Sequence, residues 1–158
     1  MDYTAILKYA FANLNGATES AILFILVIFD TFLGSKWRKV NKVAITSGGG
    51  LEGLKTNIPL ALMPISIWAF TILISIVPTH IGGRDFVFNT MIFDIISFVI
   101  TLIIGNFMLK SILANAQLAG FDVPNWIIKW VEDEYHVKFQ KMIDEPAAAN
   151  VEEIGKGK

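Results

Sequence analysis

The residues best suited to chemistry are a few polar side chains set within apolar sequence. Across the apolar run 86–109 the single charged residue is Asp94. Polar and small residues recur around it at intervals of four, three, four and four, which places them on one face of a helix. This face, called the polar seam below, consists of Thr90, Asp94, Ser97, Thr101 and Gly105. An ionisable group inside an apolar helix is a functional-site hypothesis. We predict that the seam packs against other helices or faces water after assembly.

A second, weaker set of polar residues follows helical spacing in the stretch 56–83, which has no Asp, Glu, Lys or Arg. Thr71 and Ser75 belong to this set and are the predicted partners of Asp94 across a helix bundle. Pro64 lies in the same stretch. Because proline has no backbone N–H, it removes one helical hydrogen bond and can bend the helix.

Asp30 and Gly34 mark the polar end of the first apolar segment. Asp30 precedes a basic stretch by about two helical turns. Two interpretations follow for its carboxylate. It pairs with a basic side chain near the membrane surface, or it forms a polar contact between subunits.

No residue pattern indicates catalysis or a bound cofactor. The absence of cysteine excludes disulfides and thiolate chemistry. His80 and His136 lie far apart in the sequence, without a motif around either. The glycine-rich stretch 46–57 is not a Walker A loop, because one residue separates Gly53 from Lys55. We expect a protein that is not an enzyme, with no cofactor and no metal site.

The composition predicts helices that cross a membrane. Hydrophobic residues make up 54% of the 158 residues, charged residues 17%, and the mean hydropathy is +0.56. These values are too apolar for an ordinary soluble domain. The segments 18–36, 58–77 and 86–109 are candidate spans, and the last would be about 36 Å long against a hydrocarbon core of about 30 Å. The predicted fold is an all-α integral membrane protein with three transmembrane helices, and we expect it to be oligomeric.

The connection 36–57 is the one strongly basic loop of the predicted fold. By the positive-inside rule it should lie in the cytoplasm, which places the N-terminus outside and the C-terminus in the cytoplasm. Its predicted functional residues are basic, small or glycine: Lys36, Arg38, Lys39, Lys42, Ser47, Gly50, Gly53 and Lys55.

Amphipathic segments flank the predicted bundle. Residues 1–16 have apolar positions at helical spacing, which favours a surface helix over a frayed terminus, with Asn15-Gly16 as its stop. Gly120 should end the third helix, and Asp122 should cap an interfacial helix anchored by Trp126 and Trp130. The predicted parts are an N-terminal segment 1–16, a bundle 17–119, an interfacial helix 120–141 and a disordered acidic tail 142–158.

Four short motifs follow one another in the sequence: Asp30-Thr-Phe-Leu-Gly34, Ser47-Gly-Gly-Gly50-Leu-Glu-Gly53-Leu54, Ser111-Ile-Leu-Ala-Asn115 and Gly120-Phe-Asp-Val-Pro124. Their order around three predicted spans resembles the bacteriophage holin family of the toxin-secretion and phage-lysis type. The similarity covers roughly residues 25–130. The chain departs from the family pattern at Ala114, where an acidic residue is common, in lacking doubled basic residues after the Gly-Leu pair, and in its long acidic tail.

The resemblance implies a multi-pass protein of the bacterial inner membrane that associates with itself and opens lesions. An endolysin, which is a murein hydrolase, or a large toxin would leave through them without tight binding. The implied partners are the lipid bilayer and further copies of the chain, and no nucleic acid. Two alternatives stay open: a small channel or transporter with Asp94 as its relay, and a scaffold that holds a soluble partner through residues 123–158.

Overall fold

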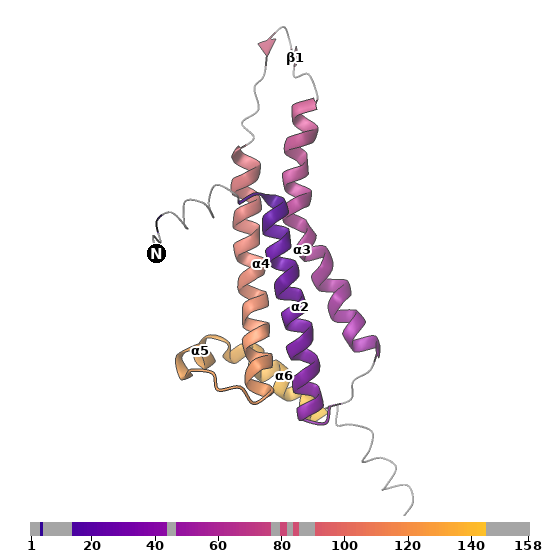
Figure 1. Cartoon of the computed structure of the whole chain (residues 1–158), viewed down its shortest axis with the longest axis vertical. Coiled ribbons are helices and arrows are strands. Elements are labelled where there is room, and N and C mark those ends of the chain that lie inside the picture. The colour runs from indigo at the N-terminus through magenta and orange to yellow at the C-terminus, as the bar shows by residue number, and fades with distance from the viewer. Residues whose placement is uncertain are drawn as a thin grey trace, which may run out of the picture. The chain divides into compact units, whose positions relative to one another are not determined.

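The computed structural model describes residues 4, 14–43, 47–76, 80–81, 84–85 and 91–144. Most of the predicted N-terminal segment, Thr90 of the polar seam and the tail from residue 145 lie outside them. The elements (Figure 1) are α2 (Gly16–Val40), α3 (Ser47–Ile76), β1 (His80–Ile81), β2 (Arg84–Asp85), α4 (Met91–Leu118), α5 (Asn125–Trp130) and α6 (Glu132–Asp144). β1 and β2 form a two-residue antiparallel pair, with His80 opposite Asp85.

Within the described residues, three helices are long and apolar enough to cross a membrane: Gly16–Val40, Gly53–Ile76 and Met91–Leu118. The prediction of an all-α membrane protein with three spans is therefore confirmed. Oligomerisation stays a prediction.

The basic connection is shorter than the predicted loop 36–57. α2 continues to Val40, and α3 already begins at Ser47, so most of the glycine-rich stretch is helical. Glycine disfavours a helix by about 1 kcal/mol per residue. Extending an existing long helix, however, avoids the cost of nucleating a new one. The prediction of a loop is therefore wrong for residues 47–57.

Asn15 caps the start of α2, and the helix predicted before it lies outside the described residues. Its side-chain oxygen accepts the backbone N–H groups of Ala17 at 3.0 Å and Thr18 at 3.1 Å. The Thr18 hydroxyl oxygen in turn accepts the Asn15 backbone N–H at 3.0 Å. This reciprocal arrangement satisfies N–H groups that the first turn leaves without helical partners.

Gly120 ends α4 in the predicted way. Its φ of +84° is a left-handed conformation that glycine adopts without steric cost. The Phe121 N–H donates to the Ala116 carbonyl oxygen at 3.1 Å, and the Gly120 N–H to that of Gln117 at 3.0 Å. These two bonds make a Schellman motif, which turns the chain out of the helix.

The predicted interfacial helix is divided into α5 and α6 at Val131, whose side chain has no exposed surface. The residue at the N-cap of α5 is Pro124, so the prediction that Asp122 caps this helix is wrong. The break turns Val131 inward, whereas Trp126 is 72% exposed.

Contacts between α-carbons divide the chain into two units. The first comprises Met1–Ile25 and Ile58–Gly105, and the second Leu26–Asn57 and Asn106–Lys158. In the first unit, Phe70 and Phe93 stack with ring centroids 6.5 Å apart. The second unit has an apolar cluster against which Tyr135 and Met142 of α6 pack; it consists of Trp37, Val43, Leu118 and Ala119.

Candidate functional site

Asp94 lies in the first turn of α4. It lines a cavity of about 270 Å³ together with Trp68, Thr71, Ile72 and Ser75 of α3. The structure thus brings Asp94 to the two hydroxyl residues predicted as its partners. Both hydroxyls also bond within their own helix, Thr71 to the Trp68 carbonyl oxygen at 2.5 Å and Ser75 to that of Ile72 at 2.7 Å.

The buried acid of the first unit is Glu19, which the sequence analysis did not select. Its side chain is 1% exposed. The Ser97 hydroxyl donates to Glu19 Oε2 and lies 3.2 Å from the Pro64 carbonyl oxygen. The Thr101 hydroxyl lies 3.4 Å from the same carboxylate oxygen and donates to the Ser97 carbonyl at 2.9 Å. Two residues of the polar seam therefore contact Glu19 of α2.

α2 and α3 approach closely beside this carboxylate. A Cβ atom at Gly16 would overlap the Cβ of Trp68 and the carbonyl oxygen of Pro64. The Ile65 backbone N–H donates to the Ser20 hydroxyl oxygen at 3.0 Å. A side chain of α2 thus supplies a hydrogen bond next to the proline, as neighbouring helices do in membrane bundles. By contrast, a Cβ at Gly105 would meet Leu23 at an ordinary 3.8 Å.

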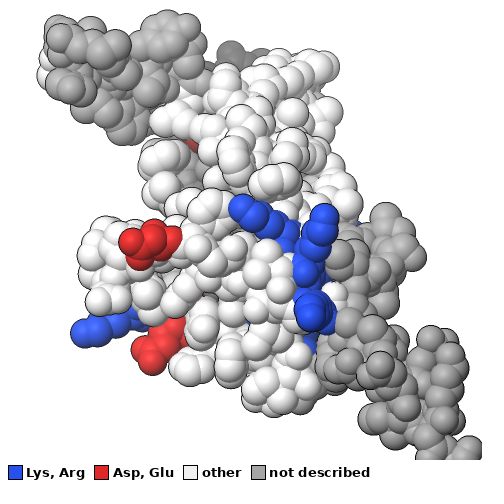
Figure 2. All heavy atoms as spheres, turned by 60° about the horizontal axis from the view of Figure 1, so that its bottom comes forward, with Lys and Arg blue, Asp and Glu red and all other residues white. Residues whose placement is uncertain are grey.

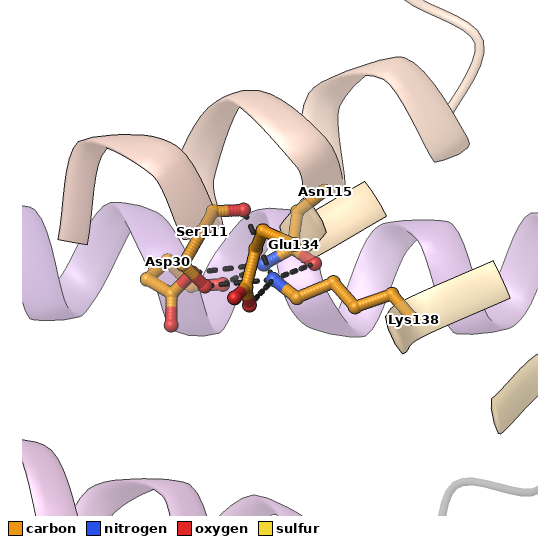
Figure 3. A network of polar contacts seen from close by, with 5 residues as sticks. All are labelled: Asp30, Ser111, Asn115, Glu134 and Lys138. Atoms are coloured by element: carbon orange, nitrogen blue, oxygen red, sulfur yellow. Dashed lines mark hydrogen bonds and ion pairs between the residues drawn. The ribbon is translucent and has the colours of Figure 1, made fainter. Parts of the chain in front are cut away.

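The second unit contains a hydrogen-bonded network around Asp30 (Figure 3). The Ser111 hydroxyl donates to Asp30 Oδ1 at 2.6 Å, and Asn115 Nδ2 donates to the same oxygen at 2.8 Å. Both donors come from α4. A Cβ at Gly34 would lie 3.5 Å from Asn115 Nδ2, so this glycine leaves room for the amide.

Lys138 of α6 completes the network. Its Nζ donates to the Ser111 hydroxyl oxygen at 2.7 Å, the Ser111 carbonyl oxygen at 3.0 Å and Asn115 Oδ1 at 2.8 Å. Glu134 Oε1 lies 3.4 Å from Nζ. Burial lowers the pKa of Lys138 below its usual value, and the negative charges of Asp30 and Glu134 oppose this shift.

This network bears on the two interpretations of Asp30. The basic side chain that approaches its carboxylate through Ser111 and Asn115 is Lys138 of α6, whereas the predicted partner came from residues 36–39 at the end of α2. Whether Asp30 also contacts another subunit stays a prediction. Because the Asp30 and Lys138 charges are bridged by neutral donors, one connected set of bonds joins α2, α4 and α6.

The predicted basic residues make different contacts. Lys36 Nζ lies 4.0 Å above the Phe121 ring, and the Arg38 guanidinium lies 5.7 Å from the Trp37 ring. Lys39, Lys42, Gly53 and Lys55 are exposed, and the side-chain surroundings of Ser47 and Gly50 lie outside the description. In Figure 2, several Lys and Arg side chains lie close together on one part of the face, and another basic patch lies beside acidic atoms on the other side.

The two predicted tryptophan anchors are both exposed. Trp126 exposes most of its side chain, and the Trp130 ring is approached by Lys110 Nζ at 5.6 Å from its centroid. Across the described residues, no group of three His, Asp or Glu side chains is placed to hold a metal ion.

Together these features define a class: a multi-pass membrane protein with hydrogen-bonded polar residues between apolar helices. No family model, curated protein or solved structure matches the chain.

Proposed function

We propose that the chain is a holin-like protein of the bacterial inner membrane. It associates with further copies of itself and opens lesions through which an endolysin or a large toxin leaves the cell. The observation that carries this proposal is that the chain buries only a small part of the surface of each span. The apolar windows of α2, α3 and α4 are 28%, 11% and 17% buried. Most of their surface is left for lipid or for neighbouring copies.

The cavity beside Asp94 supports self-association. Asp94 is half-buried, and its cavity opens between α3 and α4. An ionised Asp carboxylate costs about 2.5–3.5 kcal/mol at the centre of a span, and Asp94, in the first turn of α4, would bear part of that cost if it faced lipid. A neighbouring copy that supplied a hydrogen-bond donor to this cavity would lower that cost. Polar contacts between helices in lipid contribute about 0.6–2 kcal/mol each.

The arrangement in the membrane follows from the basic residues. α2 ends with Arg38 and Lys39, and Lys42 follows it. By the positive-inside rule this connection lies in the cytoplasm, together with α5 and α6. The N-terminus then lies outside.

The test is expression of the full chain in a bacterial host that also makes a cytosolic murein hydrolase without an export signal. We expect abrupt lysis that requires both proteins. Survival with the hydrolase retained in the cytoplasm would contradict the proposal. Selective conductance of small ions without hydrolase release would instead indicate a channel. Retention of a soluble partner without lysis would indicate a scaffold.

The assembly surface is tested with two variants of one residue. Asp94→Leu removes the charge and the hydrogen-bonding atoms, and we expect loss of cross-linked oligomers and of lysis while the protein still accumulates in the membrane. Asp94→Asn retains the shape and most hydrogen bonds, and should keep much of both. The control is Asp122→Leu, an exposed acid outside the spans. Equal lysis timing for wild type and Asp94→Leu would exclude a role for Asp94.

A further inference from the structure

A polar cavity of about 310 Å³ lies in the second unit, beside the Asp30–Lys138 network. Residues from α2, α3, α4 and α6 line it. Its size falls at the lower end of cavities that hold small molecules, about 300–1,000 Å³. The side chains that matter for its chemistry are Asp30, Arg38, Asn57, Glu134, Lys138 and Lys141.

The charges around this cavity favour an anion. Three cationic side chains line it against two carboxylates. Asp30 and Glu134 are both near Lys138 Nζ, whose pKa they influence. Arg38 and Lys141 bring further positive charge from α2 and α6. A guanidinium matches the geometry of a phosphate, to which it donates two parallel hydrogen bonds.

The cavity also lies at the level where the spans become polar. The apolar core of α2, residues 21–29, ends just before Asp30. The apolar run of α4 ends at Leu109, shortly before Ser111 of the same cavity. In a bilayer, this transition from apolar to polar residues coincides with the lipid headgroups. Basic pockets between helices at this level are typical binding sites for anionic headgroups.

We propose that this cavity binds the phosphate of a membrane phospholipid headgroup. Arg38 and Lys141 contact the phosphate, the Asn57 amide is positioned to donate to it, and the Asp30–Lys138 network forms the adjoining wall. The proposal requires the chain to lie in a membrane but does not require lesion formation. A bound headgroup would connect α2 with α6, and lipid should therefore protect α6 from hydrogen exchange.

The experiment uses the purified full chain in detergent, titrated with dioleoyl phosphatidylglycerol and observed by native mass spectrometry. We expect a discrete one-lipid adduct. Arg38→Gln should weaken it about tenfold, because a charge-assisted hydrogen-bonded pair is lost. Arg38→Lys should give an intermediate loss, since lysine keeps the charge but not the fork. The matched control is Lys39→Gln, which removes the same charge from an exposed neighbour that does not line the cavity.

Several outcomes would overturn the proposal. Equal losses for Arg38→Gln and Lys39→Gln would indicate a diffuse basic surface rather than this cavity. Equal binding of dioleoylglycerol, which has no phosphate, would assign the contact to the acyl chains. Displacement of the lipid by millimolar inorganic phosphate, with the same dependence on Arg38, would assign the cavity to free phosphate. If lipid binding left the hydrogen exchange of α6 unchanged, the headgroup would not connect α2 with α6 as proposed.

Discussion

Glu19 and Asp94 are both acids of the first unit, but their surroundings differ. Glu19 is almost completely buried and receives a hydrogen bond from Ser97, whereas Asp94 is half-buried beside a cavity. The contact of Glu19 with Ser97 joins residues 78 positions apart. Spacing along one helix can predict the face on which Ser97 and Thr101 lie. It cannot predict which residue of another helix they meet, and so Glu19 was missed.

The buried carboxyl group gives a prediction about stability. Glu19→Leu leaves the Ser97 hydroxyl without this acceptor, and we expect it to lower the free energy of unfolding by about 1–3 kcal/mol. Glu19→Gln retains an acceptor oxygen and should cost less. The measurement is thermal unfolding of the purified chain in detergent by circular dichroism. Glu132→Leu, at an exposed acid of α6, serves as the control. A Glu19→Leu variant as stable as wild type would show that Ser97 bonds equally well within α4.

Lys138 gives a prediction about pH. Its pKa is lowered when α6 is docked, mainly by burial, whereas an undocked lysine titrates near 10.5. At a pH between the lowered pKa of docked Lys138 and about 10.5, the docked lysine is neutral and the undocked lysine is protonated. Docking of α6 therefore releases a proton in this pH range and becomes more favourable as the pH rises. We expect α6 to exchange amide hydrogens more slowly, after correction for intrinsic rates, at the upper end of this window.

Lys138→Met removes the titrating group, and this dependence should disappear in it. Lys129→Met, at an exposed lysine of α5, should leave the dependence intact. Docking that weakens as the pH rises would show that attraction to Asp30 and Glu134 outweighs the cost of burial.

At the scale of elements, the sequence predicts each span because a long apolar run has one stable structure in lipid, the helix. It predicts element ends less well. Gly120 acts as expected because its left-handed φ is a local property of the chain. The start of α3 at Ser47 and the break at Val131 were not predicted. At Val131 a buried position in the second unit decides where the helix divides, and sequence periodicity does not contain that information.

The next prediction concerns how α5 is anchored on the membrane. Trp126 and Trp130 are exposed, and tryptophan favours the headgroup layer. Replacing both with Ser should weaken the docking of α5 on the membrane while the three spans stay inserted. In vesicles, we expect trypsin to cut after Lys129 several-fold faster in the double variant. Ile143→Ser, at an exposed apolar residue of α6, is the control and should be cut at the wild-type rate. Equal cleavage of all three proteins would show that the tryptophans do not anchor α5.

For the whole molecule, hydropathy gives the number of spans, and basic residues give an expected direction across the membrane. Neither gives the number of copies in an assembly, because that depends on surfaces that one chain leaves uncovered. α3 has the smallest buried share of its apolar window and so the largest share available to lipid or to neighbouring copies. The polar contacts described above join helices of one chain, and they do not determine how many copies assemble.

The direction across the membrane can be tested with single cysteines, because the natural chain has none. Asp85 lies in β2, between α3 and α4, and His136 lies exposed on α6. Three spans put these two positions on opposite sides. With the basic connection in the cytoplasm, an impermeant maleimide should label Asp85→Cys in intact cells and His136→Cys only after permeabilisation.

Lesions would admit the reagent, so labelling must precede lysis, and a cytosolic cysteine protein in the same cells must stay unlabelled. With that control satisfied, the reverse pattern would invert the proposed orientation. It would place α6, Lys138 and the phosphate-binding cavity outside the cell. Labelling of both positions in intact cells would put them on one side, which a membrane-spanning α4 between them does not allow. That result would require α4 to lie along the membrane rather than across it.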